Sequence, residues 1–256
     1  MPGGGPPPMK KAADFMVEFP ALRSDDRITK ARKILRENTF REVYAQDGKR
    51  RLVGYIDITD VLHVTATKSD VTIEGYLKDI TPVSQGDTLG IVLETIRKNK
   101  TDSVPVVDDH GIFLGGVLLS ELFPVVLTMQ RLHGPVCDAM TRNVITCSAE
   151  DTVQRIHALI IDTGYSAFPV IKKKKVIGMI SRRDLLKDGR WRTSSETTTT
   201  VDNLMTTPVI TTGPDDDIRS AADGMVKHDI SRLPVIENDV IVGIIDRHDV
   251  LNSMAR

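Results

Sequence analysis

Four short stretches of the sequence place polar residues directly after an apolar run, where a strand is expected to give way to a helix. The third stretch, VIGMISRRDLL (176–186), contains Ser181, Arg182 and Asp184. A hydroxyl at the start of a helix and an acid three residues later form a capping box. The same residues could instead bind a ligand, with an anion at the helix N-terminus and hydroxyl groups of the ligand on the aspartate. The residue types alone allow both interpretations.

The other three stretches differ from the third at the positions of Ser181 and Asp184. The corresponding pairs are Asp57 with Asp60, Leu118 with Glu121, and Asp246 with Asp249. A carboxylate in place of the serine hydroxyl would repel a phosphate unless a cation counters it. Arg41 precedes the first stretch and Arg232 the fourth, and each could supply that cation. We therefore rank the third stretch first as a ligand site, the fourth second and the first third, and expect the second to be empty.

These stretches belong to a repeat. Its period is 61 to 65 residues, measured between Gly54, Gly115, Gly178 and Gly243. An apolar block precedes each glycine, and within it we align Pro105, Pro169 and Pro234 with Val43. A period of this length fits a small α/β unit better than a solenoid repeat.

The third copy shows the order of elements most clearly. A β-branched strand is expected at 143–148, and a helix after it that stops at Gly164. The helix has one apolar face, formed by Val153, Ile156, Leu159 and Ile160. Two apolar strands joined by the lysine turn 172–175 and a second helix complete the unit. Such a unit buries little surface alone, so copies 1 and 2, and copies 3 and 4, should pair and bury faces such as Ile156 and Ile160 within each pair.

Composition excludes several classes of protein. The net charge of −1 and the 4% aromatic content give no field or stacking surface for nucleic acid, and the lysine turn is best explained as solvated charge. No apolar run reaches the roughly 20 residues that span a bilayer. Cys137 and Cys147 lie at no zinc-ligand spacing, so we expect two reduced cysteines, no metal site and a cytoplasmic location.

The Pro-Val block, the glycine junction and the period together resemble the CBS domain family, from about Phe15 to Met254. The resemblance implies an α/β fold in which four β-α-β-β-α units form two pseudo-twofold pairs in a disc. We place the units at 15–66, 67–128, 129–192 and 193–256. Residues 1–14 are then a flexible leader, in which Met9 could be the natural start.

The resemblance also implies a ligand site. In CBS domains the aspartate holds a ribose, the serine or threonine lies by the phosphates, and the backbone beside the Pro-Val block contacts adenine. Carried onto the third copy, this assigns Asp184 to ribose, Ser181 to phosphate, and Ala167 and Phe168 to the base, while Arg182 adds positive charge beside the phosphate position. Further candidates are Thr146 and Thr211 at the first strands of copies 3 and 4, and the residues Arg232, Asp246, Asp249, Arg41, Asp57 and Asp60 of the other copies.

The function that this resemblance implies is regulatory. The chain would bind AMP, ADP or ATP as a regulatory ligand for energy sensing and act on a protein partner or on its own homodimer through the CBS faces. No nucleophile–base pair or phosphate-binding loop appears in the sequence, so no catalytic residue is expected. Two alternatives stay open: a scaffold that needs no ligand, and a sensor of S-adenosylmethionine or methylthioadenosine. A nucleic-acid-binding module is less favoured.

Overall fold

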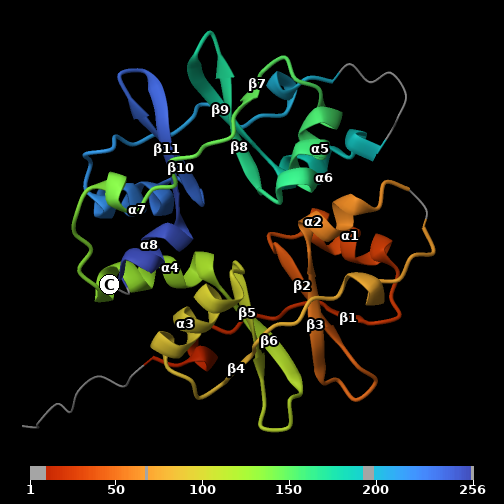
Figure 1. Cartoon of the computed structure of the whole chain (residues 1–256). Coiled ribbons are helices and arrows are strands. Elements are labelled where there is room, and N and C mark those ends of the chain that lie inside the picture. The colour runs from red at the N-terminus through yellow and green to blue at the C-terminus, as the bar shows by residue number, and fades with distance from the viewer. Residues whose placement is uncertain (1–9, 67–68, 193–198, 255–256) are drawn as a thin grey trace, which may run out of the picture.

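Four units of similar structure lie around a common centre (Figure 1). The computed structural model describes residues 10–66, 69–192 and 199–254, so most of the leader and residues 193–198 of the polar linker lie outside the described residues. Unit 1 contains β1 (Ala21–Arg23), α1 (Ile28–Glu37), β2 (Glu42–Gln46), β3 (Leu52–Asp57) and α2 (Ile58–His63). Unit 2 contains β4 (Val83–Ser84), α3 (Leu89–Asn99), β5 (Ser103–Val107), β6 (Phe113–Leu118) and α4 (Leu119–Met129).

Units 3 and 4 repeat this plan. Unit 3 contains β7 (Cys147–Ser148), α5 (Val153–Thr163), β8 (Ala167–Lys172), β9 (Lys175–Ser181) and α6 (Arg182–Asp188). Unit 4 contains α7 (Ile218–Lys227), β10 (Arg232–Glu237), β11 (Val240–Asp246) and α8 (Arg247–Met254). In the three-stranded sheets the first strand is parallel to the second, and the second is antiparallel to the third. The α/β fold of paired units is therefore confirmed.

The first strands are shorter than the sequence predicts. The strand expected over 143–148 is reduced to the two residues of β7. In unit 4 the parallel pairing consists of one bridge, between Thr212 and Val235. The reason is that the preceding residues pair elsewhere, since Thr141 bridges to Ile244 of unit 4.

A leader segment precedes each unit and crosses to the neighbouring unit of its pair. The crossings are the bridges of Val17 with Gly116, Lys78 with Tyr55, Thr141 with Ile244, and Thr206 with Met179. Each leader contains a short 3-10 turn: η1 (Ala12–Asp14), η2 (Glu74–Tyr76), η3 (Val136–Asp138) or η5 (Val201–Asn203). Ala12 is fully buried, so the packed structure includes residues that the sequence assigns to the flexible leader. The crossings pair unit 1 with unit 2 and unit 3 with unit 4, as the sequence indicates.

These crossings also explain the glycines that mark the repeat. A Cβ atom added at Gly54 would lie 2.7 Å from the carbonyl oxygen of Lys78, and one at Gly115 would lie 2.5 Å from that of Val17. At Gly243 it would overlap the sulfur of Met140. A side chain at these positions would therefore displace the leader of the partner unit.

The helices pack between the pairs, which corrects one prediction. Ile156 and Ile160 are fully buried, but in a cluster that also contains Ile28, Leu35 and Val61 of unit 1. Helices α5 and α6 contact α2, while α7 contacts α4 and α8 contacts α3. The prediction that these faces are buried within each pair is wrong, because within a pair the strands and leaders face one another and leave the helices outward for the other pair to cover (Figure 1).

The strand registers correct the alignment of the first copy. Glu42 lies opposite Asp57, as Arg232 lies opposite Asp246. Tyr44, and not Val43, is therefore the counterpart of the three prolines. Unit 1 lacks the proline that marks this position in the other units, so the sequence offered no local marker for the register. It follows that Arg41 corresponds to Ser231 and that unit 1 has no counterpart of Arg232.

Candidate ligand-binding site

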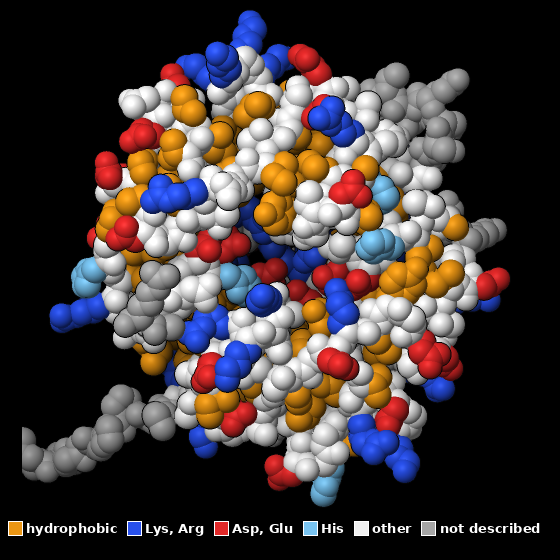
Figure 2. Space-filling view, in the orientation of Figure 1, with side chains coloured by type: hydrophobic (Ala, Val, Ile, Leu, Met, Phe, Trp, Pro, Cys, Tyr) orange, Lys and Arg blue, Asp and Glu red, His pale blue; other side chains and the backbone are white. Residues whose placement is uncertain are grey.

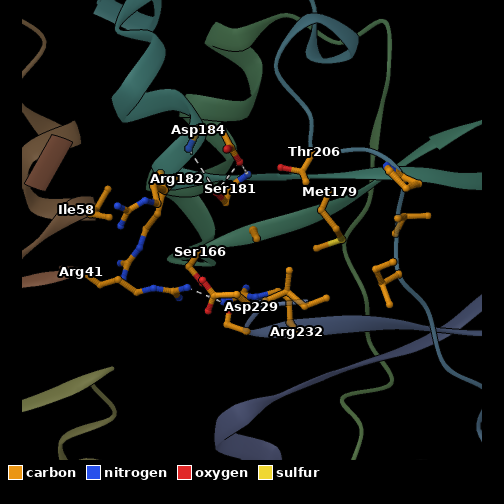
Figure 3. Close-up of a pocket in the computed structure, with 17 residues that line it drawn as sticks. Arg41, Ile58, Ser166, Met179, Ser181, Arg182, Asp184, Thr206, Asp229 and Arg232 are labelled. Carbon is orange, nitrogen blue, oxygen red and sulfur yellow. Dashed lines mark hydrogen bonds between the residues drawn. The ribbon is translucent and has the colours of Figure 1, made fainter. Parts of the chain in front are cut away.

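A cavity of about 240 Å³ lies between units 3 and 4 (Figure 3). Unit 3 lines it with the ends of β8 and β9 and the first residues of α6. Unit 4 lines it with residues 208–210 of its leader and with residues 229–232 before and at the start of β10. The crossing of the leader thus places an apolar wall opposite the polar junction of unit 3.

Ser181 and Asp184 form a capping box at the start of α6. Asp184 Oδ2 accepts hydrogen bonds from the Ser181 backbone nitrogen at 2.8 Å and from Ser181 Oγ at 2.6 Å. Among the described residues, Asp184 Oδ1 has no hydrogen-bond partner. The cap therefore uses one carboxylate oxygen and leaves the other available at the cavity wall, so the capping and ligand interpretations are compatible.

The two arginines after Ser181 are held by unit 1. Arg182 donates hydrogen bonds to Asp57 Oδ2 at 3.2 Å and to Thr59 Oγ1 at 2.8 Å, and 12% of its side chain is exposed. Arg183 donates to the backbone carbonyls of residues 38–40. Arg182 lines the cavity, but its guanidinium is already engaged in binding unit 3 to unit 1.

Two further arginines reach the cavity from other units. Arg41 of unit 1 donates to Asp102 Oδ2 at 3.2 Å and to Ser231 Oγ at 3.2 Å. Arg232 of unit 4 has a guanidinium with no hydrogen-bond or ion-pair partner among the residues that the structure describes. Burial lowers the pKa of Arg232 and outweighs the opposing attraction of Asp246. Arg232 is therefore the cation that can bind a ligand anion without first breaking a contact.

Several residues assigned from the sequence do not line this cavity, namely Thr146, Phe168, Thr211 and the aspartates of the other junctions, Asp246, Asp249, Asp57 and Asp60. Phe168 is fully buried in the core beneath β8, although its neighbour Ala167 does line the cavity. Thr146 and Thr211 follow the leader residues that line cavities, but neither lines this one. The leader residues 208–210 that do so were missed, since the sequence alone gives no sign that a leader crosses to the partner unit.

The equivalent positions of units 1 and 2 are filled by the protein's own side chains. In unit 1, Lys78 Nζ forms ion pairs with Asp57 at 3.0 Å and Asp60 at 2.7 Å. Beside the unit 2 junction, Phe19 of the unit 1 leader stacks on Phe40 of unit 1 with ring centroids 4.2 Å apart, and both rings pack in one cluster with Leu118. An internal cation therefore occupies the aspartate pair of unit 1, and an aromatic pair occupies the counterpart in unit 2.

A polar cavity of about 270 Å³ lies at the centre of the molecule, where basic and acidic side chains meet (Figure 2). Charged groups of all four units line it or border it. Ser103 Oγ donates to Glu42 Oε2 at 2.8 Å, and His248 Nε2 lies 3.7 Å from Asp102 Oδ1. Together with the Arg182–Asp57 ion pair, these contacts connect the four units in one electrostatic network.

Burial and neighbouring charges shift the pKa values of this network. Burial, reinforced by the charge of Asp102, raises the pKa of Glu42 to about 7. Burial disfavours ionisation of Asp57, but the charges of Arg182 and Lys78 and the hydrogen bonds from Lys78 and the Asp60 backbone together outweigh it and lower the pKa of Asp57. Burial likewise opposes the charged form of His248, yet the nearby Asp102 raises its pKa.

We expect the free energy of unfolding to fall as pH rises from 5 to 8. Between about pH 4 and 7 the folded chain keeps a proton on Glu42 that the unfolded chain has lost, so this stabilisation is present at low pH and lost as pH passes through the folded pKa. Asp249, whose pKa is also raised to about 7, and His248 contribute with the same sign. The share of Glu42 is on the order of 1–3 kcal/mol.

Chemical denaturation of Glu42→Gln across this pH range tests the prediction, with Glu150→Gln as an exposed control. The Glu42→Gln chain should lose less stability between pH 5 and 8 than the wild type, and the control should follow the wild type. Identical pH profiles for all three chains would contradict the assignment.

The comparison with protein-family models decides the family. The model of the CBS domain matches residues 12–66, 73–127, 136–189 and 201–256. The chain belongs to the CBS domain family. The four matched segments coincide with the four units. Each segment also includes the crossing leader before its unit, so a CBS domain in this chain consists of a leader and the unit that follows it. No group of three or more potential metal ligands occurs in the described part of this CBS protein.

Two solved structures of similar extent share the fold of this chain. An uncharacterised protein of Methanocaldococcus jannaschii, MJ1225, is 22% identical over 258 residues, which cover 89% of this chain and 92% of that protein. Its crystal structure, described as that of a proposed archaeal homologue of γ-AMPK, matches 95% of this chain and 99% of that chain with a TM-score of 0.79. A conserved Pyrococcus horikoshii protein of uncharacterised function matches 96% of this chain and 100% of that chain with a TM-score of 0.64 and 19% identity.

Another relative shares one half of this CBS protein. The uncharacterised protein MJ0188 of Methanocaldococcus jannaschii is 34% identical over 122 residues, which span 46% of this chain and 43% of that protein. None of the helices in the described CBS units is long and apolar enough to span a membrane.

Proposed function

We propose that this chain is a regulatory module that binds an adenine nucleotide in the cavity between units 3 and 4 and passes the signal to a protein partner or to its own assembly. One observation carries the proposal: Asp184 and Arg232 line the same cavity. Among the described residues, neither Asp184 Oδ1 nor the Arg232 guanidinium has a hydrogen-bond partner. The carboxylate oxygen accepts hydrogen bonds from a ribose diol. The apolar leader residues 208–210 cover the base, and Arg232 binds the phosphate.

The charges around the cavity favour a phosphorylated ligand. Its lining includes four arginines and two aspartates. The residue that caps α6 is the neutral Ser181, which does not repel an anion. AMP, ADP and ATP share the adenosine and the first phosphate that these residues would bind. Adenosine compounds without a phosphate, and a scaffold role without any ligand, are the alternatives that the experiment below separates from this proposal.

We expect Asp184→Ala to weaken AMP binding by about 10- to 100-fold, because a lost charge-assisted hydrogen bond costs about 1.5–3 kcal/mol. Isothermal titration calorimetry measures the affinity, and thermal melting without ligand measures the loss of the helix cap. Asp162→Ala, an exposed substitution on α5, is the control. A melting point that falls while AMP affinity stays unchanged would show that Asp184 acts only as a cap.

Arg232→Ala extends the same titration to the phosphate. This variant should bind adenosine nearly as well as the wild type but lose most of its preference for AMP. Added salt should reduce that preference in the wild type, because the Debye length is about 8 Å at 0.15 M ionic strength. Equal binding of adenosine and AMP by the wild type would contradict the assignment of a nucleotide.

A further inference from the structure

A second cavity, of about 330 Å³, is the pseudo-symmetric counterpart of the first. Here the leader of unit 3 provides the wall, through Val144 and Ile145, and unit 4 provides the polar junction between β11 and α8. Tyr165 stands at the rim, with 47% of its surface exposed. The cavity thus combines an apolar wall for a base with an aspartate, Asp249, at the position that Asp184 holds in unit 3.

The junction differs from that of unit 3 in one functional group. Asp246 caps α8 where Ser181 caps α6, and the two aspartates cap reciprocally. Asp249 Oδ2 accepts from the Asp246 nitrogen at 2.9 Å, and Asp246 Oδ1 accepts from the Asp249 nitrogen at 3.0 Å. The two carboxyl side chains also interact directly with each other, and burial together with the charge of Asp246 raises the pKa of Asp249 to about 7. A carboxylate therefore replaces the hydroxyl at the place where unit 3 would hold a phosphate.

The balance of charge is reversed between the two cavities. The unit 3 cavity is lined by four arginines against two aspartates, and the unit 4 cavity by Arg232 alone against Asp246 and Asp249, as far as the described residues extend. Arg232 lines both cavities, so when it binds a phosphate in the first it is not available to offset Asp246 in the second. Juxtaposed like charges suppress binding of the wrong partner, which gives the carboxylate a role in selectivity.

We propose that the unit 4 cavity binds an adenosine compound whose 5′ substituent is uncharged or cationic, and that Asp246 excludes a phosphate there. This inference rests on the proposed function, because it assumes that both cavities recognise adenosine. The chain would then respond to two chemical classes of ligand, an anionic nucleotide in unit 3 and a neutral or cationic adenosine derivative in unit 4.

Three probes that differ only at the 5′ position test the inference: AMP, adenosine and 5′-amino-5′-deoxyadenosine. Calorimetric titrations use the full chain carrying Asp184→Ala, which weakens the unit 3 cavity and leaves the unit 4 lining intact. The amine and adenosine should each bind this chain about tenfold or more tightly than AMP. Adding Asp246→Ser should remove this discrimination and raise the affinity for AMP by a similar factor.

Two further variants make the result specific. Serine and asparagine both cap helices well, so Asp246→Ser and Asp246→Asn keep α8 capped and should relax the discrimination alike. Ser181→Asp in the otherwise wild-type chain should impose the reverse change on unit 3 and weaken AMP more than adenosine. If the Asp184→Ala chain binds AMP as tightly as adenosine, or binds no probe, while the wild type still binds AMP, this inference is wrong and the proposed function stands. Absence of binding by the wild type contradicts both.

Discussion

Arg182→Ala should lower the free energy of unfolding by about 3–5 kcal/mol, because breaking a buried ion pair from one side leaves the other charge without a partner. Arg182 joins α6 of unit 3 to Asp57 and Thr59 of unit 1. Burial disfavours the charged form of Arg182, but the nearby carboxylates of Asp57, Glu42 and Asp102 outweigh this effect and raise the pKa of the guanidinium. Arg182 is therefore charged in the folded protein. It contributes a buried ionic contact between the two pairs of units, beside the helix packing that joins them.

Urea denaturation at pH 7 measures this effect, with Arg27→Ala as the matched control. Arg27 also forms an ion pair, with Asp70 at 2.9 Å, but 66% and 90% of the two side chains are exposed. Exposed pairs contribute little to stability, so the control should remain close to the wild type. If the free energy of unfolding falls equally in both variants, the central network does not hold the pairs of units together.

The second large effect is expected at a glycine of the repeat. Gly54→Ala should destabilise the chain by about 2–4 kcal/mol, because the residue combines an unfavourable backbone conformation with a close approach. Its φ angle is +152°, and an added Cβ would lie 2.7 Å from the backbone oxygen of Lys78. This oxygen belongs to the crossing leader of unit 2, which cannot move without breaking its bridge to Tyr55.

Gly48→Ala is the control for this experiment, since an added Cβ there has no other atom within 4 Å. Thermal and urea unfolding should leave this variant near the wild type. Equal stability of the two variants would show that the leader of unit 2 adapts to a side chain at position 54, and that the close approach does not explain the repeated glycine.

The sequence was sufficient for features that arise within one unit. Helix α5 begins after its cap Thr152 and ends at Gly164, which adopts the left-handed conformation with φ of +71°. The junction at Ser181 contains the capping box that its residue spacing indicates. Apolar periodicity and caps are local signals, and they were enough to predict the order of elements within each unit.

Features that depend on contacts between units could not be predicted from one copy. The crossing leaders bring residues 208–210 to the cavity of unit 3, far from the junction in sequence. Lys78 lies in the leader of unit 2 but neutralises the aspartates of unit 1. Arg182 has the spacing of a phosphate contact, yet it binds Asp57 of another unit. Long-range pairing of this kind leaves no periodic pattern in the sequence.

The cavity between units 3 and 4 also shows why repeated residues need not have repeated roles. The four strand–helix junctions occupy equivalent positions but face different groups. A lysine faces the junction of unit 1, an aromatic pair faces that of unit 2, and cavities face those of units 3 and 4. The residues that make this difference lie on the partner unit in each pair, so the ability to bind a ligand is a property of the pair.

A crystal structure of the chain grown with saturating AMP tests the central claim most directly. We predict AMP in the cavity between units 3 and 4, with its ribose hydroxyls on Asp184 Oδ1, its phosphate on Arg232 and its base against residues 208–210. An empty cavity at saturating AMP, or AMP bound elsewhere with these residues unchanged, would contradict the account.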